Sequence, residues 1–381
     1  MSGEKRKLIF LVTEDWYFWS HRLPMARAAQ QAGFDVVVAT RVAAHGARIA
    51  AAGFRVMPLR WRREEIGPWA SLAAIVEVYR LYRRERPFMV HHIAHKAAIL
   101  GGIAALLARV PRVVSFIAGV GYMGTSRSRH ARLVGAAAQL LWPVLLLRRH
   151  CRVIVQNDDD RALIEALRPG AADRITVIRG SGVDLDHFKP LPEPPSPPVT
   201  AAYIGRMIAI KGVATLVAAQ RLLHDEGVDL RLLLVGTPDL ANPSSFDEAT
   251  LRGWSQSPGI VWCGHREDVR EIWATVHIAV LASEGGEGVP KTLLEAAAVG
   301  RAIVATDVAG NRDIARNGVN ATLVPPSDAP ALAAALKSLA NDPTRRRAYA
   351  TAGRTLAADG FSEEAVSAAT IALYRSLSAA V

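Results

Sequence analysis

Short β-type apolar runs alternate with helical stretches along the whole chain, and this alternation constrains the fold more than any other feature. The alternation comes in two series of similar length, separated by the proline-rich segment LPEPPSPPV at 191–199. Such a pattern is typical of α/β units with parallel sheets. Ligands of doubly wound sheets bind beyond the carboxyl ends of the strands. We therefore expect two facing doubly wound domains with an interdomain cleft.

The expected strands give each domain its own parallel sheet. In the first half they lie at 8–13, 35–40, 89–94, 112–117, 152–157 and 174–179. In the second half they lie at 200–205, 231–236, 259–264, 277–283, 301–307 and 321–326. Both domains are thus predicted to be Rossmann-like.

The proline-rich segment sets the expected domain boundaries. Its prolines can join neither a helix nor a central strand, which favours an extended linker at 191–199. The first domain is then 1–190 and the second 200–360. The last segment, 361–381, is predicted to be an amphipathic helix with Ser362 as N-cap, packed back on the first domain. A chain of 381 residues, half of them apolar, suits two cores.

Charge and cysteine content narrow the class of protein. The formal net charge is +11, which favours an anionic partner: a phospholipid surface or a phosphorylated substrate. Nucleic acid is not indicated, because no zinc-finger or RNA-binding signature accompanies the charge. Cys151 and Cys263 are far apart in sequence, so neither a disulfide framework nor a metal site is expected, and a cytoplasmic location fits. The first apolar run, LIFLVT, is too short for a signal peptide.

One apolar stretch at 133–147 carries two open interpretations. It is shorter than the roughly 20 residues of a membrane-spanning helix, and Pro143 interrupts it. Arginines flank it, so the basic, apolar segment is 127–149 as a whole. It is either a core helix of the first domain or a surface helix that rests on an anionic bilayer.

In the second half, cationic residues follow the strand at 200–205. Gly205 allows a ligand to approach the backbone closely. Arg206 and Lys211 supply two cations beside the start of the next helix, whose free N–H groups and dipole favour anions. The pattern predicts a diphosphate site. It lacks the P-loop spacing, so a nucleoside triphosphatase is not indicated. The alternative interpretation is a pair of solvated surface cations.

A glycine-rich loop and a helix follow the strand at 277–283, in the sequence EGGEGVPKTLLEAAAVG at 284–300. Pro290 suits the first turn of that helix, and the N–H groups around 288–291 would favour a phosphate. Glu287 lies in the loop and Glu295 in the helix, where carboxylates can accept sugar or ribose hydroxyls. The alternatives are compensation of the helix dipole by Glu287 and an exposed helical charge at Glu295.

Together these segments resemble the family 4 retaining glycosyltransferases of the GT-B fold, over nearly the whole chain. The resemblance lies in GRMIAIKG (205–212), EGVPKTLLEAAAVGRAIVATDVAGNRDI (287–314), NGVNATLVPPSD (317–328) and GSGVDLDHFKP (180–190). Similar DWYF, SHRLP and AGVGY segments occur among bacterial polysaccharide and capsule glycosyltransferases. The resemblance implies a GT-B fold whose second domain binds a nucleotide-sugar donor.

The resemblance also implies roles for residues around the donor phosphates. Arg206 and Lys211, which follow the glycine-containing turn at Gly205, match the pair that holds the donor diphosphate. Gly288 and Val289 match the loop whose N–H groups reach the phosphate.

Further roles concern the sugar, the ribose and the base. Glu287 matches the acidic residue beside the donor sugar, and Glu295 matches the one that accepts the ribose hydroxyls. His265 and Arg266 would lie near the base. Family members generally need no metal, and no metal or other cofactor is expected here. The run Asp158–Asp160 is interpreted as the capped start of a helix.

The first half matches the family less closely. Relatives often have a histidine after the strand that here is followed by AGVGYMGTS, and this position offers none. The candidates for that catalytic role are His21, His92, His95 and Lys96, and of these we name His92 as the catalytic residue. Other acceptor-side candidates near strand ends are His21, His95, Lys96, Gly119 and Gly121. Each of these histidines has a structural alternative, as a satisfied core or loop residue.

The expected function is retaining sugar transfer from a nucleotide-sugar, with a UDP-sugar favoured over a GDP-sugar. The expected acceptor is a glycan or a polyprenyl-diphosphate-linked glycan at the cytoplasmic face of the inner membrane, with peripheral contact to anionic lipid. Two alternatives remain open at this point: a nucleotide-sugar epimerase of similar fold and a catalytically silent subunit.

Overall fold

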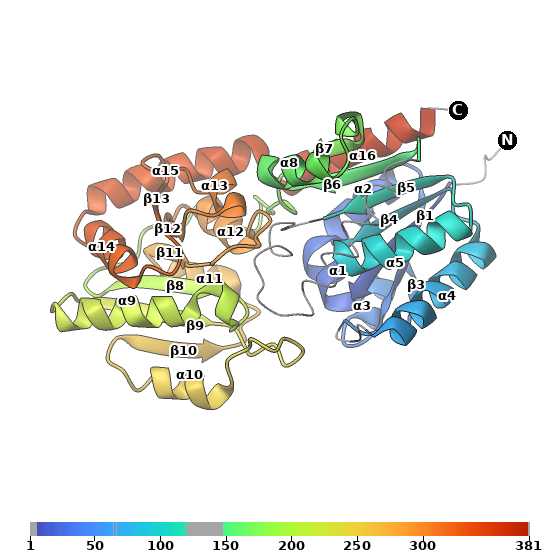
Figure 1. Ribbon diagram of the computed structural model, residues 1–381. Helices are drawn as coiled ribbons and strands as arrows, with labels where there is room; N and C mark the ends of the chain where they lie inside the picture. The colour runs from blue at the N-terminus through green and yellow to red at the C-terminus, as the bar shows by residue number, and fades with distance from the viewer. Residues whose placement is uncertain (1–5, 64, 66, 118, 120–147, 380–381) are drawn as a thin grey trace. The chain divides into compact units, whose positions relative to one another are not determined.

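The computed structural model describes residues 6–63, 65, 67–117, 119 and 148–379 (Figure 1). Within them the chain forms two compact units. Unit 1 contains residues up to Ser181 together with the segment from Glu363 onward, and unit 2 runs from Gly182 to Ser362. The expected membrane-contact segment 127–149 lies outside the described residues except at Arg148 and Arg149.

Unit 1 is built on a parallel sheet of seven strands in the order β3-β2-β1-β4-β5-β6-β7. The strands are β1 (Lys7–Glu14), β2 (Asp35–Arg41), β3 (Arg55–Pro58), β4 (Met89–Ile93), β5 (Arg112–Phe116), β6 (Cys151–Val155) and β7 (Ile175–Val177). Each strand expected in this half forms. Strand β3 was not expected, because it is a short edge strand whose first and last residues are exposed and lack an apolar pattern.

The described helices of unit 1 pack against its sheet. They are α1 (Asp15–His21), α2 (Leu23–Gln31), α3 (Gly46–Ala51), α4 (Pro68–Glu85), α5 (Ala94–Leu107), α8 (Asp158–Leu167), the 3-10 turn η1 (Ala172–Arg174) and α16 (Glu363–Ala379). The last helix, α16, packs along α2. Its Tyr374 hydroxyl bonds Nδ1 of His91 in β4, and Arg112 donates to the carbonyl of Leu377 at 2.7 Å.

Unit 2 has a parallel sheet of six strands in the order β10-β9-β8-β11-β12-β13. The strands are β8 (Val199–Ile204), β9 (Leu230–Val235), β10 (Ile260–Gly264), β11 (Ile278–Leu281), β12 (Ala302–Thr306) and β13 (Ala321–Val324). Chain order reverses direction between β8 and β11. In doubly wound sheets the ligand crevice opens at such a point, beyond the carboxyl ends of the two strands.

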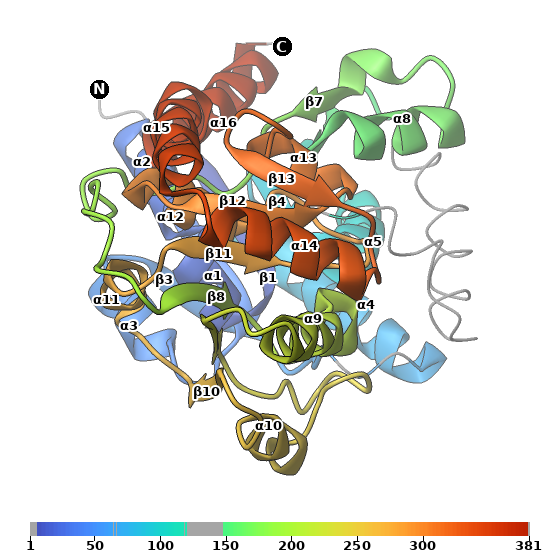
Figure 2. The ribbon, with the colours of Figure 1, turned by 90° about the vertical axis from the view of Figure 1, so that its left-hand side faces the viewer.

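The helices of unit 2 pack as pairs against its sheet. They are η2 (Ala209–Lys211), α9 (Val213–Asp225), α10 (Glu248–Trp254), α11 (Val269–Ala274), α12 (Lys291–Val299), α13 (Ala309–Ile314), α14 (Ala329–Ala340) and α15 (Pro343–Gly360). Helix α9 lies beside α14, as Figure 2 shows, and α12 lies beside α15. Strands and helices bury one continuous apolar core that includes Trp273, Tyr203 and Leu294.

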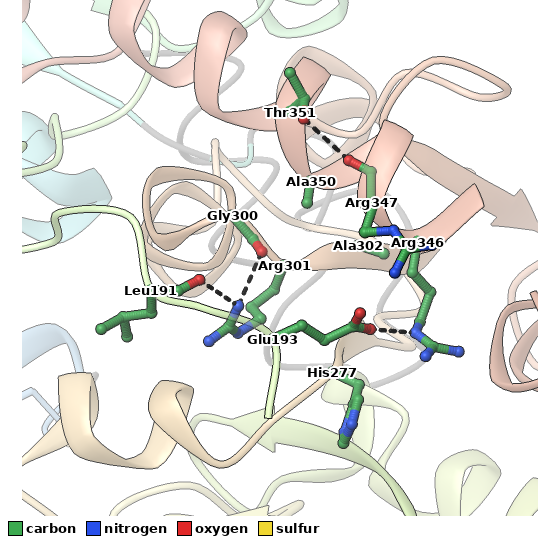
Figure 3. A pocket seen from close by; sticks show the side chains of 10 residues that line it. All are labelled: Leu191, Glu193, His277, Gly300, Arg301, Ala302, Arg346, Arg347, Ala350 and Thr351. Atoms are coloured by element: carbon green, nitrogen blue, oxygen red, sulfur yellow. Dashed lines mark hydrogen bonds and ion pairs between the residues drawn. The ribbon is translucent and has the colours of Figure 1, made fainter. Parts of the chain in front are cut away.

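The proline-rich segment was expected to be an extended interdomain linker. Its start is bonded to unit 2, and the division between the two compact units falls earlier, at Ser181. Two buried arginines hold it. Arg301 donates to the carbonyls of Leu191 and Pro192 at 3.0 and 2.9 Å, and Arg346 pairs with Glu193 at 2.5 Å. Figure 3 shows these side chains around a cavity of about 260 Å³. A buried guanidinium needs acceptors, and this segment supplies them.

Candidate functional site

The first candidate element is the loop that follows β8, whose backbone is fixed by a buried tyrosine. Tyr203 is fully buried, and its hydroxyl donates to the carbonyl of Arg206 at 2.6 Å. Gly205 leaves room for that hydroxyl, since a Cβ there would lie 2.8 Å from it. The Arg206 guanidinium is partly exposed and donates to Asp239 at 2.7 Å. Arg206 is therefore a partnered cation at the carboxyl end of β8, whereas the sequence left open whether it was simply solvated.

Lys211 reaches across the point where strand order reverses. It closes the short turn η2, and its ammonium donates to Oε1 of Glu287 at 2.5 Å, although 76 positions separate the two residues. Gly212 makes this approach possible. It has φ +69°, and a Cβ there would lie 1.9 Å from the carbonyl of Ala282, just after β11. The loops after β8 and β11 thus meet.

Glu287 is held by one carboxylate oxygen and offers the other. Its exposed fraction is 9%. Oε1 accepts from both Lys211 and the hydroxyl of Ser283. No described residue donates to Oε2, and that atom is not buried. Because the lysine and the serine fix the orientation of the carboxylate, Oε2 is the oxygen available to a ligand hydroxyl.

Ser283 was missed in the sequence, and it is the residue that orients Glu287. It is fully buried, and its carbonyl accepts from the hydroxyl of Thr306 at 2.5 Å. Asn311 donates in turn to the carbonyl and hydroxyl of Thr306 at 3.0 and 3.2 Å. Thr306 and Asn311 come from the ATDVAGN stretch, so this motif supports the Glu287 loop from behind. The sequence signal for this orienting role was a serine four residues before Glu287.

Replacing Ser283 by alanine is expected to lower kcat roughly ten- to a hundredfold with little change in thermal stability, because one hydrogen bond to a charged group is lost. In a Glu287→Gln background the same change is expected to add little, since the serine acts through that carboxylate. The steady-state rate of the sugar transfer that the sequence leads us to expect measures both effects. Ser376→Ala, which removes a hydroxyl bonded only within α16, serves as control. Equal losses in both backgrounds would contradict the positioning role.

The next part of the site is the loop between Glu287 and the start of α12. Helix α12 begins at Lys291 with Pro290 as its N-cap, one residue later than the sequence indicated. Gly288 lies against Gly310, where a Cβ would come within 1.6 Å of the Gly288 carbonyl. Val289 is buried next to it. The positive end of the α12 dipole therefore lies beside Glu287 and Lys211.

Glu295 lies in the second turn of α12 and is 9% exposed, so it is not an ordinary solvent-facing helical charge.

His265 and Arg266, the two residues expected near the base, lie farther from the point where strand order reverses. His265 and Arg266 are both exposed and follow β10, the edge strand two positions from β8. Arg266 forms two bonds to Asp268, at 2.8 and 2.5 Å, and this pairing lowers the pKa of the Asp268 carboxyl.

In unit 1, His92 is a core residue. Its side chain is fully buried in β4, with Nε2 at 3.0 Å from the Tyr82 hydroxyl and Nδ1 at 3.4 Å from that of Ser115. Burial lowers the pKa of His92 to about 3. In this structure the ring is bonded within the core of unit 1, and the catalytic role expected for His92 stays a prediction.

Other acceptor-side candidates gather at the reversal of the first sheet, between β1 and β4. His21 ends α1, stacks on Tyr17 and bonds Ser20 at 2.6 Å. His95 and Lys96 begin α5, directly after Ala94, whose φ of +70° is unusual for a residue with a Cβ. The ammonium of Lys96 donates to the carbonyls of Arg62 and Glu65, and so anchors the loop before α4.

The remaining first-half candidates concern backbone approach. The amide of Gly119 donates to Asp160 at 3.0 Å, and Gly119 has φ +68°. Gly121 lies outside the described residues. Asn157, rather than the aspartates, caps α8 by accepting from the amide of Asp160 at 2.7 Å. The run Asp158–Asp160 forms the first turn, and Asp160 serves the loop of Gly119.

Neither a metal-binding cluster nor a membrane-spanning helix occurs within the described residues. No group of three or more potential metal ligands is assembled in this part of the chain. Nor does any described helix have the length and apolar character to cross a membrane.

Comparison with known proteins finds two family models that match this chain. A family model described as glycosyl transferases group 1 matches residues 198–342, and one described as glycosyl transferase 4-like matches residues 7–155. The chain is 22% identical to the capsular polysaccharide biosynthesis glycosyltransferase CapM of Staphylococcus aureus, with 82% of each chain covered. It is 25% identical to an Escherichia coli UDP-Gal:alpha-D-GlcNAc-diphosphoundecaprenol alpha-1,3-galactosyltransferase, with 71% of each chain covered.

Among solved structures, HepE of Anabaena in complex with UDP and glucose matches with a TM-score of 0.75 at 16% identity, covering 97% of this chain and all of that one. The two family models together span both sheets, and these comparisons favour a glycosyltransferase over an epimerase. The chain is an enzyme of the group 1, family 4-like glycosyltransferases, with the GT-B fold.

Proposed function

We propose that this glycosyltransferase moves a sugar, with retention of configuration, from a UDP-sugar to a glycan or polyprenyl-diphosphate-linked glycan during cell-surface polysaccharide synthesis. The observation that carries the donor assignment is the meeting of Lys211 and Glu287 at the strand reversal of unit 2, with Arg206 on the same edge. The UDP complex of HepE and the names of the capsular and diphosphoundecaprenol-dependent relatives support the substrate classes.

In the proposed mechanism, unit 2 binds the donor. Arg206, Lys211 and the amides of Gly288 and Val289 hold the diphosphate at the start of α12. Negative charge grows on the leaving phosphate as the bond from the anomeric carbon breaks, and cations fixed in advance stabilise that charge. Oε2 of Glu287 accepts a hydroxyl of the donor sugar, and Glu295 accepts the ribose hydroxyls.

The acceptor hydroxyl then attacks the anomeric carbon from the face that the diphosphate leaves. The bond electrons go to the leaving phosphate oxygen, and that oxygen takes the acceptor proton. No separate protein base is required, which fits a first unit whose candidate histidine His92 is buried. The enzyme would act at the cytoplasmic face of the inner membrane, as a peripheral protein.

Thermal shift with UDP-, GDP- and ADP-sugars tests the donor assignment. The UDP-sugars are expected to stabilise the protein most, because a ligand bound only to the folded state raises the midpoint of unfolding. A larger shift from GDP-sugars would replace the base assignment while leaving the diphosphate site intact. No shift from any of these nucleotide-sugars, together with no transfer, would contradict the proposed donor site.

Chelation is expected to leave the activity unchanged, because cations of the protein take the place of a metal at the diphosphate. Sugar transfer is measured after dialysis against EDTA and again after Mg²⁺ or Mn²⁺ is restored. A rate that falls by about tenfold or more on dialysis and returns with the metal would show that the two cations are insufficient.

A further inference from the structure

Helix α4 has an unusual solvent-facing side. Its inner side is formed by buried residues that include Ala74, Val78 and Leu81. With 3.6 residues per turn, the opposite side is a stripe whose first half is apolar and whose second half is arginine. This outer stripe consists of Trp69, Leu72, Ala73, Val76, Arg80 and Arg83.

The apolar half of the outer stripe is open to solvent. Trp69 is 81% exposed and Leu72 is 50% exposed. A surface helix usually presents polar residues on this side, and clustered exposed apolar residues mark an interaction surface. The helix covers part of one face of the sheet of unit 1, beside α5 (Figure 1).

The stripe carries positive charge without acidic residues. Neither carboxylate of α4 belongs to the stripe, although Glu77 borders it one turn before Arg80, and both are held by other groups. Glu77 accepts from the amide of Arg60 at 2.9 Å. Glu85 pairs with Lys7 and Arg55 at 3.0 and 2.5 Å, and these bonds lower its pKa to about 2 despite the opposing effect of burial. The outward charge of the stripe therefore comes from Arg80 and Arg83 alone.

The apolar half also lies at the edge of the sheet where ligands bind. Helix α4 follows β3 and precedes β4 in a parallel sheet. Its first turn, with Trp69, is therefore at the carboxyl edge, and its last turn is at the amino edge. A surface docked through Trp69 and Leu72 would come to the same edge that carries His95 and Lys96.

We propose that the outer stripe of α4 docks unit 1 on an anionic bilayer. This inference rests on the proposed lipid-linked acceptor and names the surface that meets the lipid. Tryptophan is suited to the boundary between headgroups and acyl chains, and arginines are attracted to anionic headgroups. A second copy of this chain fits less well, because the same stripe on the partner contains no carboxylate and so offers no anionic group to Arg80 and Arg83.

Flotation of the full-length protein with vesicles tests the proposal. Vesicles of equal parts phosphatidylglycerol and phosphatidylcholine are expected to bind the protein, and vesicles of phosphatidylcholine alone much less. Arg80→Gln with Arg83→Gln is expected to lower partitioning roughly 30-fold. Trp69→Ser with Leu72→Ser is expected to lower it about tenfold or more. All of these side chains lie on the outer side of the helix, so the midpoint of thermal unfolding is expected to stay unchanged.

Matched changes on unit 2 control for general loss of charge or apolar surface. They are Arg252→Gln, on an exposed arginine of α10, and Leu240→Ser, at a 97% exposed leucine. Both are expected to bind vesicles like the parent protein. The thermal shift caused by UDP is expected to be equal in all variants, so failure of the donor assignment is detected separately.

Three results would overturn the docking surface. The first is no flotation of the parent protein with anionic vesicles. The second is equal flotation of parent and stripe variants. The third is a stripe variant that changes the oligomeric state in light scattering while vesicle binding is unaltered, which would assign the stripe to a protein contact.

Discussion

Replacing Lys211 by alanine is expected to lower kcat about 10²- to 10³-fold, because a cation fixed beside the leaving diphosphate is removed. Glu287 would also lose the ammonium that holds its Oε1. Lys211 is 21% exposed at its side chain, so water can reach the freed carboxylate and the fold is expected to survive. Glu287→Gln, which keeps the shape of the side chain, is expected to lose a similar amount.

The rate of steady-state sugar transfer measures the loss of activity, and circular dichroism measures whether the variant stays folded. Lys337→Ala is the matched control, because Lys337 pairs with Glu226 at 2.7 Å on the exposed surface of the same unit. That variant is expected to transfer sugar at the parent rate. Full activity in Lys211→Ala would remove the lysine from the proposed site, whereas unfolding of the variant would assign it a structural role.

Gly310→Ala is expected to be the most damaging change to a residue that touches no ligand. A Cβ there would meet the carbonyl of Gly288 at 1.6 Å, so either the Glu287 loop or α13 must move. Overpacking of this kind costs about 1–3 kcal/mol of unfolding free energy. Displacement of Gly288 would also weaken UDP binding, by about tenfold or more, since backbone amides must meet the phosphate at hydrogen-bond distance.

Calorimetric unfolding and UDP titration test this prediction together. Gly253→Ala is the control, because Gly253 lies in α10 and a Cβ at that position would meet only open space. That change is expected to stabilise the helix by roughly 0.5–1 kcal/mol. Unaltered UDP affinity in Gly310→Ala would show that the Gly288 loop plays no part in holding the nucleotide.

The strands of the second unit were predicted well, and the motifs named from the sequence follow directly on them. Once β8 and β11 are neighbours in a parallel sheet, Lys211 and Glu287 must come to the same edge. Their spacing and chemistry were visible in the sequence. The partners that fix them were not, because Asp239 and Ser283 reach these residues through the fold of intervening loops. Side chains that orient a functional group do not form a recognisable pattern in the sequence.

The first unit was harder to predict because its polar residues lie both at strand ends and inside strands. His91 and His92 point to opposite faces of β4, and both are enclosed by the packed core. One bonds Tyr374 of α16, and the other bonds Tyr82 of α4. Neither partner is near in sequence, so the sequence alone could not distinguish a satisfied core histidine from a catalytic one.

The proline-rich segment shows the same difficulty for domain boundaries. Its prolines lie in neither a helix nor a strand, as expected, although Val199 already begins β8. The arginines that hold it, Arg301 and Arg346, lie more than a hundred residues downstream. The composition predicts that the segment is locally stiff. The unit to which the segment is attached depends on residues that the fold brings into contact with it.

A crystal structure of the protein soaked with UDP tests the central claim most directly. We predict that the terminal phosphate lies within hydrogen-bond distance of Arg206, Lys211 and the amides at the start of α12, with the ribose near Glu295. UDP bound elsewhere, or the Lys211–Glu287 pair intact and unoccupied at saturating nucleotide, would contradict the account.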